Sequence, residues 1–147
     1  MKVVNISQNA RFQAKAPVDA EFTNPPGAGL ARLLFQELRS AGWSTRDLEN
    51  WRDCGWCFTA SADQAILLIA LSRWRKDGEW MLQILPKQSP GFINRLFGSK
   101  PSAVRADVFR LACLVHEILK SRFNYGRALW RRNGYPREGA SSNEPQM

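Results

Sequence analysis

Residues 65–87 read AILLIALSRWRKDGEWMLQILPK, and this segment determines the class of fold. Its two apolar runs flank Asp77-Gly78, a dipeptide typical of the two-residue type I′ turn in a β-hairpin. A turn at this dipeptide predicts a complementary charge pair beside the turn and large apolar pairs behind it. The predicted cross-strand pairs are Lys76 with Glu79, Arg75 with Trp80, Trp74 with Met81, Arg73 with Leu82, Leu71 with Ile84, and Ala70 with Leu85.

Side chains alternate along the two predicted strands, and this alternation divides them between two faces of the hairpin. One face contains most of the large apolar side chains: Leu67, Ile69, Leu71, Trp80, Leu82 and Ile84. The other face contains Ser72, Trp74, Met81 and Gln83. We expect helices to cover the first face and to leave the second face open.

Two segments with helical periodicity lie on either side of the predicted strands. In residues 30–41 apolar side chains recur at helical spacing, and Gly42 is the expected left-handed end of this helix. The second helix begins near Pro101, with Ser99 or Ser102 as its cap. The arc of this helix that should lie on the sheet consists of Val104, Val108, Leu111, Val115, Ile118, Leu119 and Arg122.

The predicted order of elements is α-β-β-β-α, an α+β fold. A further strand is expected at 55–61, and the polar residues 44–53 could hold one helical turn capped by Ser44. The strands form a three-stranded antiparallel meander with both helices packed on one face. We assign 1–29 to an irregular N-terminal arm, 30–137 to a single α+β domain, and 138–147 to a flexible C-terminal tail.

Composition restricts the class of protein and of partner. With 147 residues, of which 44% are hydrophobic and 23% charged, the chain fits one globular domain with an apolar core. The net charge of +8 favours an anionic partner, such as an acidic protein, a nucleic acid or an anionic lipid surface. The chain has neither a leader-like apolar start nor an apolar run long enough to span a membrane, so we expect a cytoplasmic protein with no membrane partner.

The cysteines and the single histidine form two pairs with two intervening residues each, Cys54 with Cys57 and Cys113 with His116. A CxxC pair, a hairpin and a helix carrying CxxH resemble the outline of a treble-clef zinc finger, which implies a zinc site formed by these four residues. Here the second pair lies in the middle of its helix, and no glycine follows Cys57. On the helical wheel Cys113 and His116 also point away from the sheet. We therefore expect no metal and no cofactor.

Catalytic chemistry has little support in the sequence. A redox dithiol at Cys54 and Cys57 would need a helix directly after the motif, whereas FTAS and the hairpin follow it. The single histidine has no nucleophile motif beside it, and Gly98-Ser99-Lys100 lacks the preceding glycine of a phosphate-binding loop. We expect a protein that is not an enzyme.

Residues 120–137, KSRFNYGRALWRRNGYPR, interleave basic and aromatic side chains without an acid, and are called the basic-aromatic segment. Guanidinium groups can pair with phosphates while aromatic rings stack on unpaired bases. The same residues can instead be structural, with arginines at a helix end and aromatic rings that close the core. The candidate nucleic-acid-binding residues are Lys120, Arg122, Tyr125, Arg127, Trp130, Arg131 and Arg132.

The function that these observations favour is a small protein–protein interaction module, such as an inhibitor, immunity protein or adaptor, acting on an acidic partner. A homodimer is a further alternative, and nucleic-acid binding through the basic-aromatic segment, with or without zinc, is the second hypothesis. Residues 90–98 would extend the open face with apolar side chains, and arginines would form its rim. The candidate partner-binding residues are Trp74, Met81, Phe92, Ile93, Leu96, Phe97, Arg73, Arg75 and Arg95.

Overall fold

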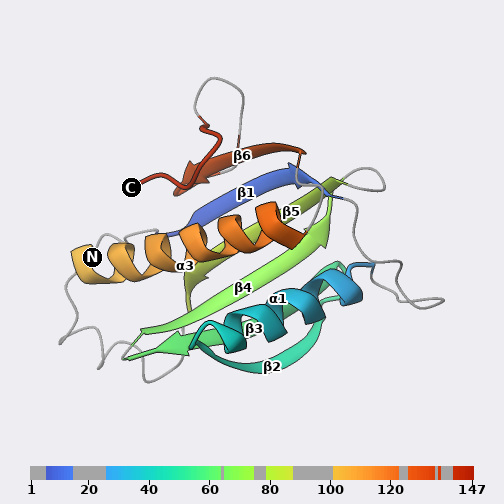
Figure 1. Ribbon diagram of the computed structural model, residues 1–147, viewed down its shortest axis with the longest axis horizontal. Helices are drawn as coiled ribbons and strands as arrows, with labels where there is room; N and C mark the ends of the chain where they lie inside the picture. The colour runs from blue at the N-terminus through green and yellow to red at the C-terminus, as the bar shows by residue number, and fades with distance from the viewer. Residues whose placement is uncertain are drawn as a thin grey trace.

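The computed structural model describes residues 6–14, 26–63, 65–74, 79–87, 101–122, 126–134, 136 and 141–147. These residues form a six-stranded antiparallel sheet and two helices (Figure 1), which confirms the α+β class. In chain order the elements are β1 (Gln8–Gln13), α1 (Ala28–Ser40), β2 (Ser44–Trp51), β3 (Gly55–Ala62), β4 (Ala65–Arg73), β5 (Glu79–Pro86), α3 (Pro101–Arg122) and β6 (Gly126–Arg132).

The sheet is larger than the predicted three-stranded meander, and its strand order is β2-β3-β4-β5-β1-β6. The predicted strands correspond to β3, β4 and β5, which are neighbours as expected. β1 was predicted as part of an irregular arm, but it lies between β5 and β6 and pairs with both. Its sequence QNARFQ has only Ala10 and Phe12 as buried apolar residues, so the short segment carries little local strand signal. Its partners lie far away in the chain.

The strand β2 also corrects a prediction, because residues 44–53 were predicted to hold a helical turn. The segment STRDLENW is polar because β2 is an edge strand, on which most side chains face solvent. Thr45 is its one fully buried side chain, and its hydroxyl donates to the carbonyl oxygen of Phe35 at 3.1 Å. A register shift between Arg46 and Glu49 and a φ of 58° at Asp47 mark a bulge.

The register of the β4–β5 hairpin differs from the predicted one by two residues. Met81 lies opposite Ser72 and not opposite Trp74, whose backbone N–H donates to the carbonyl oxygen of Glu79 at 2.7 Å. The predicted turn falls in residues 75–78, outside the described residues. A shift of two keeps every side chain on its predicted face, because the period of a strand is two. The predicted core side chains are indeed buried: Leu67, Ile69, Leu71, Trp80, Leu82 and Ile84.

Packing across the sheet explains why the turn dipeptide gave the wrong register. Trp80 lies against Gly27, where a Cβ atom would come within 2.8 Å of its ring, and its indole N–H donates to the carbonyl oxygen of Ala14 at 3.2 Å. These contacts involve segments beyond the hairpin, and β5 also pairs with β1. The register is therefore set by the whole sheet, whereas the dipeptide reports only on the turn.

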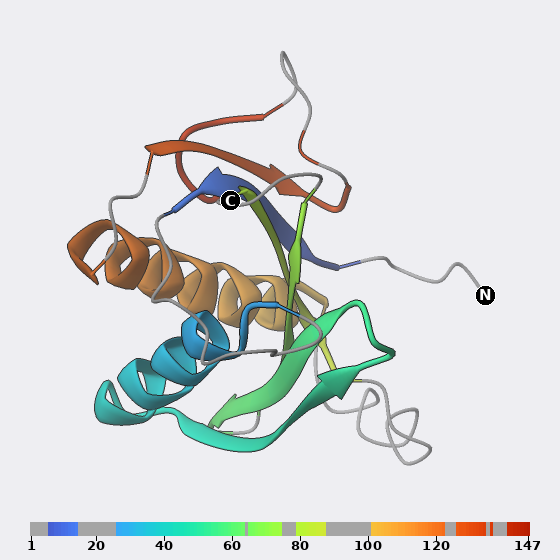
Figure 2. The ribbon, with the colours of Figure 1, turned by 90° about the vertical axis from the view of Figure 1, so that its right-hand side faces the viewer.

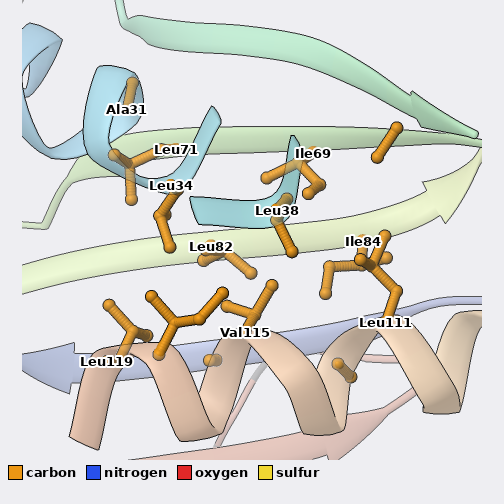
Figure 3. Packing of buried hydrophobic residues seen from close by; sticks show 14 of the residues in the cluster. Ala31, Leu34, Leu38, Ile69, Leu71, Leu82, Ile84, Leu111, Val115 and Leu119 are labelled. Carbon is orange, nitrogen blue, oxygen red and sulfur yellow. The ribbon is translucent and has the colours of Figure 1, made fainter. Parts of the chain in front are cut away.

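Both helices cover the same face of the sheet, as predicted (Figure 2). Between them and β4 and β5 lies the apolar core (Figure 3). The arc predicted for α3 is largely correct, since Val108, Leu111, Val115, Ile118 and Leu119 are buried. Arg122 instead is exposed and pairs with Glu37 of α1 at 3.1 Å, which links the two helices.

The end of α1 confirms the prediction for Gly42. The backbone N–H of Trp43 donates to Leu38 and that of Gly42 to Arg39, at 3.0 and 3.1 Å, and Gly42 has a φ of 101°. This is the Schellman arrangement, in which a left-handed residue turns the chain so that the next side chain can pack on the helix. Trp43 is accordingly part of the core.

The C-terminal part of the chain continues the sheet. Residues 126–132 of the basic-aromatic segment form β6, and Trp130 is fully buried. Residues 141–147, predicted as part of a flexible tail, are called the C-terminal strap, because they bind along the outer edge of β6. Ser142 exchanges two backbone hydrogen bonds with Trp130, and Gln146 is bonded to both Gln8 and Arg132.

Candidate functional site

The best candidate site is the sheet face opposite α1 and α3, called the open face. No described helix or strand lies on it (Figure 2). Ile66 is the most exposed large apolar side chain within the described strands, with 39% of its surface accessible. The open face also carries half-buried apolar side chains. They are Leu68 in β4, Trp74 directly after β4, Leu85 in β5 and Leu129 in β6.

Basic side chains surround this apolar surface. Arg11 lies opposite both Met81 and Leu129 in the sheet, and its guanidinium carbon is 5.9 Å from the centre of the Trp74 ring. A cation held over an aromatic ring is attracted by the negative charge of the ring face. The strand positions of this face carry Arg11, Arg46, Lys87 and Arg131 as basic residues, against Glu49 and Glu79 as acids.

The predicted partner-binding residues are only partly brought together. Trp74 is half-buried on the open face, and Met81 is on the same face but only 6% exposed. Arg73 is exposed and lies opposite Trp80, so its strand position belongs to the helix-covered face and not to the rim of the open face. The remaining predicted residues lie outside the described residues: Arg75, Phe92, Ile93, Arg95, Leu96 and Phe97.

A buried polar group lies within the open face. Asn9 is 3% exposed, and its side-chain nitrogen donates to Ser7 Oγ at 3.0 Å, but its Oδ1 accepts no hydrogen bond from the described residues. Its strand neighbours on this face are Gln83 and Arg131. Buried acceptors in folded proteins are normally paired with a donor, so Oδ1 of Asn9 is the buried atom of this face that a partner or a water can still satisfy with a hydrogen bond.

The basic-aromatic segment does not form one continuous surface. Trp130 is fully buried, so its ring is not available for stacking on a base. Arg131 lies on the open face, whereas Arg132 belongs to the opposite side and donates to the main-chain oxygen of Met147 at 2.6 Å. Lys120 and Arg122 are at the end of α3, where Glu117 and Glu37 neutralise them. Tyr125 and the side chain of Arg127 lie outside the described residues.

The two cysteine and histidine pairs lie on opposite sides of the sheet. Cys57 is adjacent to Ala70 and Glu49 on the open face, and Cys54 lies in the turn before β3. His116 belongs to α3 and packs edge-on against Trp130, with ring centroids 6.0 Å apart. His116 is buried, in contrast to the predicted outward orientation. Within the described parts of the chain, no group of three or more potential metal ligands is found.

Burial shifts the pKa values of Cys57, Cys113 and His116. It raises the pKa of the Cys57 thiol, with a smaller contribution from Glu49, and it raises the pKa of Cys113. The thiolate form is therefore disfavoured, which is the opposite of what a nucleophilic cysteine requires. Burial lowers the pKa of His116, and the charge of Lys120 adds to this effect.

Comparison with known proteins gives no family for the chain. No protein-family model matches it, and searches of curated proteins and of solved structures return no match. None of the described helices combines the length and hydropathy needed to cross a membrane.

Several residues of the open face were not identified from the sequence. Arg11 and Asn9 come from β1, and Leu129 comes from β6. The available signal was the alternation in QNARFQ and GRALWRR, which is too short to reveal a strand without its partners.

Proposed function

We propose that the chain is a non-enzymatic protein-binding module that receives an acidic partner on its open face. The observation that carries the proposal is the combination of accessible apolar side chains on neighbouring strands with surrounding arginines. Aromatic residues and arginine are enriched at the centres of protein interfaces, and this face contains the half-buried Trp74 and Arg11. The predicted extension of the face by residues 92–97 remains part of the proposal.

Charge supports an acidic partner in preference to a second copy of the chain. Basic residues outnumber acidic ones both on the described open face and in the whole chain, which has a net charge of +8. Two copies facing each other would bring like charges together, whereas an acidic protein would be attracted and would associate faster at low salt.

Site-specific photo-crosslinking in the native cells tests the proposal. A benzophenone amino acid at Ile66, on the open face, should give a discrete crosslinked species containing an acidic protein. The matched control places the same group at Gln36, which is exposed on α1, on the other side of the molecule. Binding of the purified partner should then be weakened at least about tenfold by Ile66→Asp, since a charge is buried without a counter-ion.

Two results would contradict the proposal. One is crosslinking at Gln36 to the same extent as at Ile66, because the surface would then show no preference. The other is tight, salt-sensitive binding of a single-stranded oligonucleotide that is lost in the double variant Arg131→Ala, Arg132→Ala. This second result would support a nucleic-acid-binding protein.

A further inference from the structure

A cavity of about 230 Å³ lies on the helix side of the sheet, between α3 and the ends of β1 and β6, and is called the α3–β6 cavity. Pockets for drug-sized ligands measure roughly 300–1,000 Å³, so this one suits a smaller molecule. The C-terminal strap forms part of its wall. The lining residues that matter for recognition are Ile6, Val108, Phe109, Arg105, Arg132 and Asn133.

The wall of the cavity is apolar on one part and cationic on another. Ile6, Val108 and Phe109 provide the apolar part. Arg105 and Arg132 provide two positive charges, and no described lining residue has an acidic side chain. The cavity therefore favours a molecule with an apolar body and a negative charge.

The wall contains two hydrogen-bond donors that no other described residue uses, the Asn133 side-chain amide and the Arg105 guanidinium. Asn133 has a left-handed backbone with φ 59°, fixed by two hydrogen bonds: its N–H donates to Ser7 O at 2.9 Å, and its Oδ1 accepts from Ser7 N at 3.0 Å. Because Oδ1 is used in this way, the side-chain amide nitrogen remains as a donor. Among the described residues neither this nitrogen nor the Arg105 guanidinium has a hydrogen-bond or ion-pair partner.

One arginine of the wall already binds an oxygen atom of the protein. Arg132 Nη1 donates to the main-chain oxygen of Met147 at 2.6 Å, beside the cavity. Guanidinium and amide groups together match the planar pair of oxygens of a carboxylate. We propose that the α3–β6 cavity binds a small organic acid, with its carboxylate at Arg105, Arg132 and Asn133 and its apolar body against Val108 and Phe109. This site is independent of the open face.

Titration with three probes tests this proposal by nuclear magnetic resonance and calorimetry. Benzoate has both the charge and the apolar ring, benzamide lacks the charge, and inorganic phosphate lacks the ring. Benzoate should shift the backbone signal of Val108 and the side-chain amide signal of Asn133. Benzamide and phosphate should bind at least about tenfold more weakly, since each lacks one of the two recognised groups.

Variants assign the binding to the cavity. Arg105→Gln should weaken benzoate binding at least about tenfold, while Arg32→Gln, an exposed arginine on α1, should leave it unchanged. Ala106→Phe fills the cavity from the exposed surface of α3 and should abolish binding without lowering the melting temperature. The proposal is overturned if benzoate produces no shifts at millimolar concentration, if benzamide or phosphate binds equally well, or if Arg105→Gln has no effect.

Discussion

At the scale of single residues, glycines show most clearly how one hydrogen atom in place of a side chain permits the fold. A Cβ atom at Gly55 would lie 2.1 Å from the carbonyl oxygen of Leu71, and this neighbour is backbone, which cannot rotate away. A Cβ atom at Gly42 would contact nothing within 4 Å, but its φ of 101° is one that other residues rarely adopt. The two positions therefore require glycine for different reasons.

Substitution by alanine should separate these two reasons. Gly55→Ala should cost about 2–3 kcal/mol, because β3 and β4 must move apart. Gly42→Ala should cost only about 1 kcal/mol, the usual penalty for a left-handed alanine. Chemical denaturation of both variants measures the difference. Equal losses of unfolding free energy in the two variants would contradict the close approach of β3 to β4 at Gly55.

His116 predicts a dependence of stability on pH. Because burial lowers its pKa in the folded state, the unfolded chain binds the proton more readily. The contribution of the neutral imidazole is complete above the usual histidine pKa of about 6.5, and it is lost as the pH falls below that value. Lys120 acts in the same direction, while Glu117 and Glu144 oppose it.

Thermal melting of the wild type and of His116→Phe between pH 7.5 and pH 5.5 measures this contribution, about one unit on either side of the usual histidine pKa. Phenylalanine keeps a ring against Trp130 but does not titrate. The wild type should lose melting temperature toward acid pH, and the variant should lose less. Parallel curves for the two proteins would show that His116 is not the titrating group.

At the scale of elements, β4 and β5 show which features a sequence can predict. The alternation of large apolar side chains along the sequence assigned each of them to the correct face. This works because successive side chains of a strand point to opposite faces of the sheet, so the buried face can be recognised from the sequence alone. The register was wrong by two residues, and this error was invisible to that pattern. The polar segments β1 and β2 were missed for two reasons. β2 is an edge strand whose side chains mostly face solvent, and β1 pairs with strands that lie far away in the sequence.

The same limit applies to the open face. Trp74 and Met81 were placed correctly on it from alternation. Arg11, whose guanidinium group lies near the Trp74 ring, could not be found, because its strand joins the sheet only through partners far along the chain. Trp130 was a candidate for stacking on bases, but composition does not distinguish an exposed ring from one that fills the core.

Truncating Leu71 tests the core side of β4. Its side chain is 1% exposed among the helices and neighbouring strands, so Leu71→Ala should cost about 2–5 kcal/mol. The control is Ile66→Ala on the same strand and the opposite face, which should cost less than about 1 kcal/mol. Urea denaturation gives both values. A loss at Leu71 no larger than that at Ile66 would reverse the assignment of the two faces.

At the scale of the whole molecule, the C-terminal strap protects an edge of the sheet. Its backbone pairing at Ser142 occupies the N–H and C=O of Trp130, which would otherwise be open to another strand. Removing residues 141–147 should therefore lower the melting temperature and increase self-association. Sedimentation at several concentrations measures this effect. Ser142→Ala keeps the backbone bonds and should behave as the wild type, and an unchanged truncated protein would show that the strap does not protect β6.

The position of β1 between β5 and β6 has a consequence for the order of folding. Ser7, just before β1, is hydrogen-bonded to Asn133, just after β6, and the two residues are 126 positions apart in the chain. During synthesis β2 to β5 can pair as soon as they leave the ribosome, because each is joined to the next by a short connection. The last strand to emerge then closes the longest loop at its entropic cost. Until that moment β1 has an unfilled edge, so the nascent chain is most open to misassembly just before β6 emerges.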